Sequence, residues 1–172
     1  MNLVLIGYRG AGKSSVAREL GFRLGRPVVS TDAEIVARAQ LSVPNIVNKF
    51  GWTRFRDLES QICHDLAGKD GLIIDTGGGI VLRPENVEAL KANGVVCWLT
   101  AEVPTIQARI GGDDQRPSLT GAKSFLEEVE EVLQERRPAY EAAAHLVIPT
   151  DRRSIDQVAE AILAQLPLAP SG

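Results

Sequence analysis

The chain of 172 residues has the length of one ordinary domain. Its content of 44% hydrophobic and 24% charged residues excludes a disordered, collagenous or coiled-coil protein. A formal net charge of -3 and an aromatic content of 5% argue against a protein that binds nucleic acid. No apolar run is long enough to span a membrane, and the first residues lack the basic segment of a signal peptide. We therefore expect a cytoplasmic protein without a membrane or nucleic-acid partner.

Short apolar runs alternate with stretches of helical periodicity along the chain. In chain order, strands are expected at 3–6, 27–30, 72–74, 95–99 and 146–148, and helices at 13–24, 57–67, 84–92, 103–110, 125–135 and 155–166. Short apolar runs suit parallel strands that are buried on both faces. The alternation predicts one α/β domain over residues 1–172, with helices on both faces of the sheet and ligand-binding loops at the carboxyl ends of its strands.

The segment from residue 111 to about 122 is polar and rich in glycine. It is too long for a tight connection between two helices, and long loops of this kind often close over a site. We predict that it forms a mobile lid.

Residues 7–14, GYRGAGKS, match the phosphate-loop pattern G-x-x-x-x-G-K-[ST] between an apolar run and a helix. Glycines allow successive amide N–H groups to face an anion, and the start of the helix adds the positive end of its dipole. Lys13 is expected to reach the β- and γ-phosphates, and the Ser14 hydroxyl to bind Mg²⁺. The predicted nucleotide-binding residues of this loop are Gly10, Ala11, Gly12, Lys13, Ser14 and Ser15. GTPases, ATPases and small-molecule kinases share the motif, so it does not identify the reaction.

Further polar features fall at predicted strand ends or loops and suggest an acceptor site. Gly77, Gly78 and Gly79 follow the third strand, where their backbone N–H groups can approach a ligand closely. Arg56 and Arg136 can grip one carboxylate with two guanidinium forks. Asp32, after the second strand, can accept a hydrogen bond from an attacking hydroxyl. The alternatives are surface ion pairs for the arginines, a flexible turn for the glycines and a helix N-cap for Asp32.

These pieces, in this order and spacing, resemble the shikimate kinase family over nearly the whole chain. The matching segments are GYRGAGKS (7–14), TD (31–32), GWxxFRxxES (51–60), TGGG (76–79), QRPSLTG (115–121) and RxPxY (136–140). The resemblance implies a three-layer P-loop fold of the nucleoside-monophosphate-kinase type, with five parallel strands in the order 2-3-1-4-5. It also implies ATP- and Mg²⁺-dependent phosphorylation of the 3-hydroxyl of shikimate, a step in aromatic amino-acid synthesis. The sequence shows no large apolar stripe, so we expect a monomer.

The resemblance also implies roles for individual residues. Shikimate would be bound by a region at about 32–60 together with the three glycines 77–79, which we call the glycine turn. The residues involved would be Asp32, Arg56, Gly77, Gly78, Gly79 and Arg136. Arg116 would be the lid arginine that reaches the transferring phosphoryl group, and it would form the catalytic set with Lys13 and Asp32. Arg109 and Arg153 would flank the adenine base. Trp52 packs either on the substrate ring, which its place in the acceptor motif favours, or in the core, and the role of Arg137 beside Arg136 is left open.

One position departs from the family pattern. Members usually carry D-x-D after the second strand, where the first carboxylate helps to hold Mg²⁺, but here that position is Ser30. Asp75, at the end of the third apolar run, is our candidate to take over this contact through a water molecule. The alternative is that Asp75 caps a turn or pairs with an arginine. The metal hypothesis requires the Asp75 carboxylate to lie within about 6 Å of the Ser14 hydroxyl, the reach of one bridging water.

Two other functions stay open from the sequence. One is a related kinase that acts on another small hydroxy acid, such as gluconate, because paired arginines do not distinguish the two substrates. The other is a nucleotide-binding module that has lost catalysis, which the serine at position 30 suggests. The presence of Lys13, Ser14, Asp32 and Arg116 argues against this second alternative.

Overall fold

The computed structural model describes residues 1–110 and 125–167. The predicted lid at 111–122 and its Arg116 lie outside the described residues. In the described part of the chain, no helix is both long enough and apolar enough to cross a membrane.

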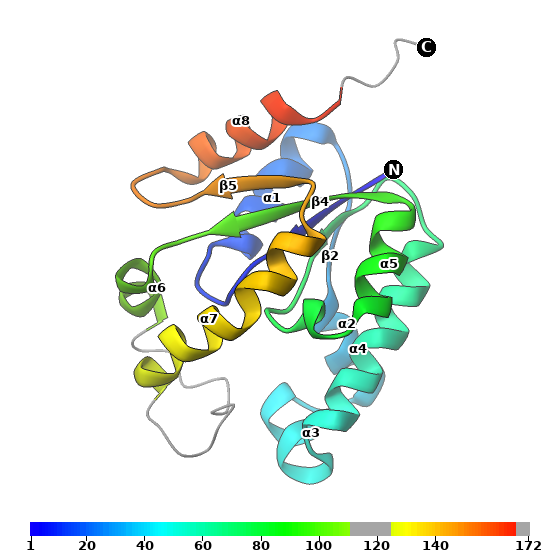
Figure 1. Cartoon of the computed structure of the whole chain (residues 1–172). Coiled ribbons are helices and arrows are strands. Elements are labelled where there is room, and N and C mark those ends of the chain that lie inside the picture. The colour runs from blue at the N-terminus through cyan, green and yellow to red at the C-terminus, as the bar shows by residue number, and fades with distance from the viewer. Residues whose placement is uncertain (111–124, 168–172) are drawn as a thin grey trace.

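The centre of the molecule is a parallel sheet of five strands (Figure 1). Its order is β2-β3-β1-β4-β5, which confirms the order 2-3-1-4-5. The strands are β1 (Asn2–Ile6), β2 (Val28–Ser30), β3 (Ile73–Asp75), β4 (Gly94–Thr100) and β5 (Leu146–Pro149). Because all neighbouring pairs are parallel, the carboxyl ends of the strands meet at one edge.

Helices cover both faces of the sheet, as predicted (Figure 1). One face packs against α1 (Lys13–Leu24) and α8 (Ile155–Gln165). The other faces a larger group: α2 (Thr31–Ala39), α3 (Val43–Phe50), α4 (Trp52–Ala67), α5 (Pro84–Ala92), α6 (Val103–Ile110), α7 (Phe125–Ala143) and the short 3-10 helix η1 (Ile80–Leu82). Along β1, Leu3 and Leu5 belong to the first core and Val4 and Ile6 to the second. This alternation is the two-residue repeat of a strand buried on both sides.

Several helices differ from the prediction. Neither α2 nor α3 was among the expected helices, although the N-cap alternative for Asp32 implied a helix after it. The side chains of Ser30 and Ser42 cap the two helices by accepting hydrogen bonds from the backbone N–H groups of Ala33 and Asn45. The helix expected from residue 57 begins at Trp52, so Arg56 lies on a helix. The helix expected to end at 135 continues to Ala143.

Pro138 explains why the end of α7 was misjudged. Proline lacks the N–H that would bond to the preceding turn, and it usually ends or kinks a helix. Here Tyr140 and Ala143, which follow it, are 0% and 1% exposed in the core. Packing of these side chains holds the helical path, and it places Arg136 on α7 rather than in a loop.

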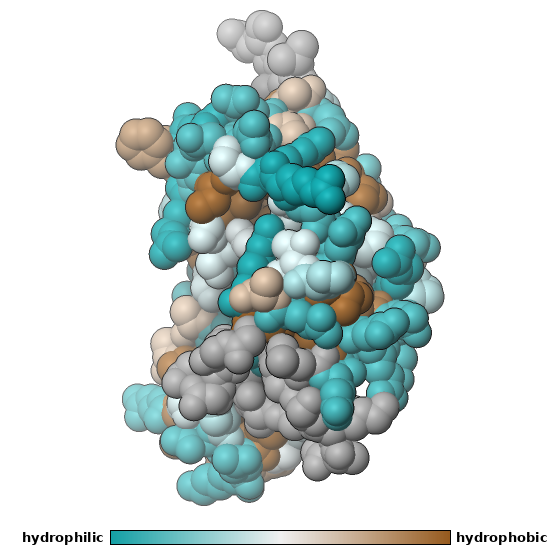
Figure 2. All heavy atoms as spheres, turned by 90° about the vertical axis from the view of Figure 1, so that its left-hand side faces the viewer, coloured by the Kyte–Doolittle hydropathy of each residue, from teal (hydrophilic) through white to brown (hydrophobic). Residues whose placement is uncertain are grey.

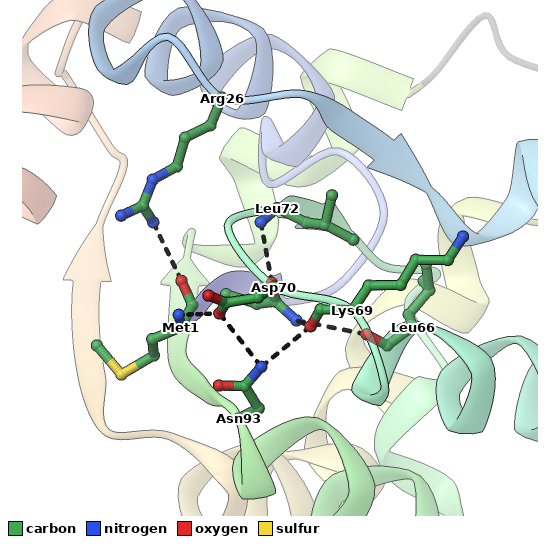
Figure 3. A network of polar contacts seen from close by, with 8 residues as sticks. Met1, Arg26, Leu66, Lys69, Asp70, Leu72 and Asn93 are labelled. Carbon is green, nitrogen blue, oxygen red and sulfur yellow. Dashed lines mark hydrogen bonds and ion pairs between the residues drawn. The ribbon is translucent and has the colours of Figure 1, made fainter.

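The amino ends of the strands are joined by a polar network (Figure 3). Asn2, only 2% exposed, donates to the Lys69 carbonyl at 2.9 Å and accepts from the Leu72 N–H at 2.9 Å. Asn93 also donates to the Lys69 carbonyl, at 3.0 Å, and the amino group of Met1 contacts Asp70. These bonds tie the loop between α4 and β3 to β1. They stabilise the edge of the sheet opposite to the carboxyl ends of the strands.

Candidate active site

The phosphate loop connects β1 to α1. Gly10 and Gly12 have φ angles of 82° and 92°, in the left-handed region that favours glycine. A Cβ at Gly10 would also come within 2.7 Å of the Ile110 side chain. Gly12 occupies the N-cap of α1, and no side chain caps this helix, so its first N–H groups are available to an anion.

Lys13 is held inside this loop. The residue is 7% exposed, and its Nζ donates to the carbonyl oxygens of Gly7 at 2.7 Å and Tyr8 at 3.1 Å. The ammonium group therefore lies in the curl of the loop, where an incoming phosphate can replace the carbonyl oxygens as its acceptor.

A cavity of about 280 Å³ opens beside the loop. Its described lining includes Lys13, Ser14, Ser15, Ser30, Asp32, Asp75, Thr76, Gly77 and Gly78. The cavity thus joins the predicted phosphate site to Asp32 and to the start of the glycine turn. Figure 2 shows the molecule from the side toward which β4 and β5 run, and hydrophilic residues predominate there.

Asp75 meets Ser14 at this cavity. The Ser14 hydroxyl donates to Asp75 Oδ2 at 2.6 Å, well inside the 6 Å that the metal hypothesis required. Asp75 pairs with Leu5 of β1 on one side and with Ser30 of β2 on the other. The distance satisfies the geometric condition, and the role of Asp75 at a metal stays a prediction.

The glycine turn is narrow because charged side chains surround it. A Cβ at Gly77 would lie 2.8 Å from Asp32 Oδ1, and a Cβ at Gly79 would overlap the guanidinium of Arg56. At Gly78 the nearest side-chain atom would be Arg136 Nη1, at 3.4 Å. None of these three glycines has a positive φ, so backbone conformation does not require glycine here. At Gly77 and Gly79 the close side chains leave no room for a Cβ, whereas at Gly78 a Cβ would make ordinary contacts. The structure therefore brings together Asp32, Arg56 and Arg136, which are far apart in the sequence.

Hydrogen bonds hold the turn in place. The Thr31 hydroxyl accepts from the Gly77 N–H at 3.0 Å, and the Tyr140 hydroxyl donates to the Gly78 carbonyl at 2.5 Å. Burial raises the pKa of Tyr140 to about 12, against the opposite effect of the neighbouring Arg136 guanidinium. The tyrosine therefore remains a neutral donor at physiological pH.

Glu59 orients the first arginine. Arg56 Nη1 donates to Glu59 Oε1 at 3.0 Å, and Glu59 is 0% exposed. Burial raises the pKa of this carboxyl group, while the charges of Arg56 and Arg136 oppose the shift. The second oxygen, Oε2, has no hydrogen-bond partner among the described residues, and a Cβ at Gly77 would lie 3.1 Å from it. The buried Glu59 side chain thus holds the Arg56 guanidinium in place through this hydrogen bond.

The remaining contacts of Arg56 involve aromatic rings. Its guanidinium carbon lies 5.2 Å from the ring centroids of both Trp52 and Phe55, which pack edge to face at 5.6 Å. Trp52 is partly buried against the core. These contacts give Trp52 a role in supporting Arg56, and stacking of Trp52 on a substrate ring stays a prediction.

Asp32 is the second residue of α2, and Ser30 is the N-cap. The alternative that Asp32 serves as the cap is therefore wrong. Asp32 lines the same cavity as Lys13 and Ser14, and its carboxylate lies near Gly77.

The two arginines expected near adenine lie on neighbouring segments. Arg109 of α6 donates to the Gly10 carbonyl at 3.0 Å and to the Thr150 hydroxyl at 3.2 Å. The backbone N–H of Arg153 donates to the Thr150 carbonyl at 3.3 Å. Thr150 thus links the α6 arginine, the phosphate loop and the loop after β5.

Arg137 points elsewhere. It lines a separate cavity of about 540 Å³ with Trp98, Leu133 and Glu141, among others. Adjacent residues on a helix face different directions, which explains why it does not join Arg136 at the glycine turn.

Thr31, Glu59 and Tyr140 lie within the motifs quoted for the family resemblance, but the sequence reasoning assigned them no role at the site. Glu59 lies three residues after Arg56, the spacing of neighbours on a helix face, and this signal was available. It was overlooked because the helix was expected to begin only at residue 57. The contact of Tyr140 with Gly78 spans 62 positions and has no local signal.

Comparison with known proteins identifies the family. The family model described as Shikimate kinase matches residues 9–167. The chain belongs to the shikimate kinase family. Relatives named Shikimate kinase include one from Symbiobacterium thermophilum, 44% identical over 96% of this chain and 96% of the relative, and one from Pelotomaculum thermopropionicum, 43% identical over 94% and 93%. The family consists of enzymes, and its kinase chemistry agrees with the phosphate loop described above.

Solved structures support the same assignment. Shikimate kinase from Acinetobacter baumannii in complex with shikimate superimposes with a TM-score of 0.88 at 33% identity, covering 94% of this chain and 90% of that one. Shikimate kinase from Aquifex aeolicus gives a TM-score of 0.83 at 30% identity, with 95% of both chains covered. A gluconokinase from Sinorhizobium meliloti shares the fold, at a TM-score of 0.60 and 17% identity over 95% of this chain and 89% of that one.

Proposed function

We propose that this protein transfers the γ-phosphoryl group of ATP to the 3-hydroxyl of shikimate, with Mg²⁺ as the metal cofactor. The observation that carries the proposal is the convergence of Asp32, Arg56 and Arg136 around the glycine turn that borders the phosphate-loop cavity. One small site then holds groups for a nucleotide, a carboxylate and a reacting hydroxyl. Family membership, and the shikimate bound to the Acinetobacter baumannii relative, support this choice of acceptor.

Shikimate has a carboxylate and ring hydroxyl groups, and the site offers partners for both. Arg56 and Arg136 would bind the carboxylate through charge-assisted hydrogen bonds, with backbone N–H groups of the glycine turn beside them. Asp32 would accept a hydrogen bond from the reacting hydroxyl. Glu59 and Tyr140 act indirectly, because they hold Arg56 and the Gly78 backbone in place.

The nucleotide would lie along the phosphate loop. Backbone N–H groups at the start of α1 and the Lys13 ammonium would bind the β- and γ-phosphates. Arg109 and Arg153, both next to Thr150, would flank the base. The residues around Ser14 fit Mg²⁺, since they offer the oxygen donors that this ion prefers.

Mg²⁺ would be held by the Ser14 hydroxyl together with nucleotide phosphate oxygens. When bound, the ion neutralises charge on the β- and γ-phosphates. Within the described residues, no group of three or more His, Cys, Asp or Glu side chains is arranged to hold a metal. A Mg²⁺ ion bound by Ser14 and the nucleotide would have few protein ligands, as is usual for Mg²⁺ sites, which rely on phosphate oxygens and water.

The transfer step is an in-line displacement. The hydroxyl oxygen forms a bond to the γ-phosphorus while the bond to the β–γ bridging oxygen breaks, and ADP leaves with that electron pair. Asp32 orients the hydroxyl and takes its proton, which then passes to solvent. Lys13 would stabilise the charge that spreads over the phosphoryl oxygens, with Arg116 from the predicted lid at 111–122. Closure of this lid would exclude water and prevent wasteful ATP hydrolysis.

We also infer that the chain works as one domain, with the substrate region at about 32–60, and as a cytoplasmic monomer. Cys63 and Cys97 are free, buried thiols, as expected in a reducing compartment. Burial raises the pKa of the Cys97 thiol to about 12, which makes it unreactive.

The decisive experiment measures ADP release with ATP and Mg²⁺ in three parallel reactions: with shikimate, with gluconate and without an acceptor. We expect turnover that depends on shikimate. Turnover with gluconate instead would indicate the related kinase. Tight nucleotide binding without turnover in any reaction would indicate a binding module that has lost catalysis.

A further inference from the structure

The carboxylate at the end of β3 has no part in the transfer step described above. Asp75 is only 8% exposed and lines the phosphate-loop cavity. Among the described residues that line this cavity, its carboxylate and that of Asp32 are the acidic groups. Asp32 lies near Gly77, whereas Asp75 accepts the Ser14 hydroxyl at 2.6 Å.

The strand register explains this placement. Ile73 belongs to the core between the sheet and α1, and the two-residue repeat of the strand directs Asp75 to the same face. That face carries the start of α1, where Ser14 lies. The hydrogen bond between Ser14 and Asp75, 61 positions apart, therefore follows from the register of β3 beside β1.

Ser30 is the direct neighbour of Asp75 on β2 and lines the same cavity. Its hydroxyl accepts the Ala33 N–H at 3.2 Å as the cap of α2. It also has no charge, so it cannot replace a carboxylate at a cation. Ser30 and Asp75, paired on adjacent strands, thus both line the cavity, and the negative charge of the pair is on β3.

A carboxylate in this position suits a metal-bound hydroxyl. Coordination to a cation makes a hydroxyl or water a stronger hydrogen-bond donor, and a charged acceptor beside it orients the ligand. Among the described residues, the hydrogen bond of Asp75 is with Ser14 and not with an arginine. This contact argues against the alternative that Asp75 serves as an arginine partner.

We propose that Asp75 is the positioning carboxylate for Mg²⁺ in the nucleotide complex, through the Ser14 hydroxyl and a metal-bound water. We further propose that positions 30 and 75, paired on adjacent strands, are interchangeable sites for this single charge. The proposal rests on the nucleotide and metal part of the proposed function. It does not depend on shikimate as the acceptor.

The test measures Mn²⁺ binding to the ADP complex by electron paramagnetic resonance, which reports free Mn²⁺ without any need for turnover. Asp75→Asn keeps the size of the side chain and removes its charge. We expect it to weaken Mn²⁺ binding by about 10- to 100-fold, the usual cost of losing a partner of a metal ligand. ADP affinity measured calorimetrically in EDTA should change by less than about twofold, because the phosphate loop is intact.

Rescue and control variants make the test specific. Adding Ser30→Asp to Asp75→Asn should recover most of the Mn²⁺ affinity, because the charge returns to the paired position. Asp70→Asn makes the same chemical change at the opposite edge of the sheet and should leave Mn²⁺ affinity unaltered. If Asp75→Asn does not fold, Asp75→Ser serves as the second variant, and it should show the same loss.

Wild-type Mn²⁺ affinity in a folded Asp75→Asn or Asp75→Ser protein would overturn the proposal. Loss of metal-free ADP affinity to the same extent would also overturn it, because the residue would then support the loop rather than the metal. Absence of rescue by Ser30→Asp would refute interchangeability. Failure of the proposed function gives a different result: the wild type would bind Mn²⁺ with ADP and show no shikimate-dependent ADP release.

Discussion

The space around Gly79 provides a sharp test of the acceptor site. Its φ of -97° is accessible to alanine, so Gly79→Ala introduces no backbone strain. The new methyl group would overlap the guanidinium of Arg56. Because this group is the end of a flexible side chain, we expect Arg56 to move while the fold persists.

The size of the effect follows from the contacts that Arg56 would lose. A hydrogen bond to a charged group contributes about 1.5–3 kcal/mol, and about 1.4 kcal/mol corresponds to a factor of ten. Losing one such interaction with the substrate carboxylate should raise the KM for shikimate by about 10- to 150-fold. The KM for ATP should change by less than about twofold, since the phosphate loop is separate from this contact.

Steady-state kinetics of four proteins would check this reasoning: the wild type, Gly79→Ala, Arg56→Ala and the double variant. If Gly79→Ala acts by displacing Arg56, the double variant should be no worse than Arg56→Ala alone. Gly68→Ala, at the end of α4 with ordinary backbone angles, is the matched control and should behave like the wild type. Additive effects in the double variant, or an unchanged KM for shikimate in Gly79→Ala, would refute the assigned geometry.

Three further predictions concern stability and catalysis. Asn2→Ala leaves the buried Leu72 N–H without its acceptor and should lower the free energy of unfolding in urea by about 1–3 kcal/mol; no change would mean that this network is not needed. The pKa of Glu59 is raised in the folded state above its ordinary value of 4.5. The stability that the protonated Glu59 side chain contributes is therefore fully present below pH 4.5 and is lost as the pH rises through the folded-state pKa. Urea unfolding from pH 4.5 upward should therefore show a weaker pH dependence in Glu59→Gln, and an equal slope would contradict this assignment. Lys13→Met should reduce kcat by about 10²- to 10³-fold, whereas Lys49→Met, at an exposed position, should retain wild-type turnover.

Features formed by neighbouring residues were predictable from the sequence alone. The phosphate loop is contiguous from Gly7 to Ser14, and its glycine spacing directly determines a curled backbone followed by a helix. The order of the strands was not worked out from local patterns; it came from the family resemblance, which several spaced motifs carried together. Strands and helices could be told apart in the sequence because short apolar runs and helical repeats differ in their period.

Other features depended on packing between distant segments. The helices α2 and α3 are short, and their capping serines gave only weak local evidence. The continuation of α7 past Pro138 depends on the burial of Tyr140 in the core. The free energy gained by this burial comes from tertiary packing and cannot be read from the helix propensities of the local residues.

The site itself shows the same division. Residue types and spacing identified Arg56, Arg136 and Asp75 individually as candidate site residues. Only the folded sheet brings the two arginines to one turn and joins Asp75 to Ser14 by a hydrogen bond. Strand register and helix packing set these distances, and both result from the summed burial of many side chains far apart in sequence. Local sequence therefore determined the chemistry available to this protein, and the tertiary structure decided which groups can act together.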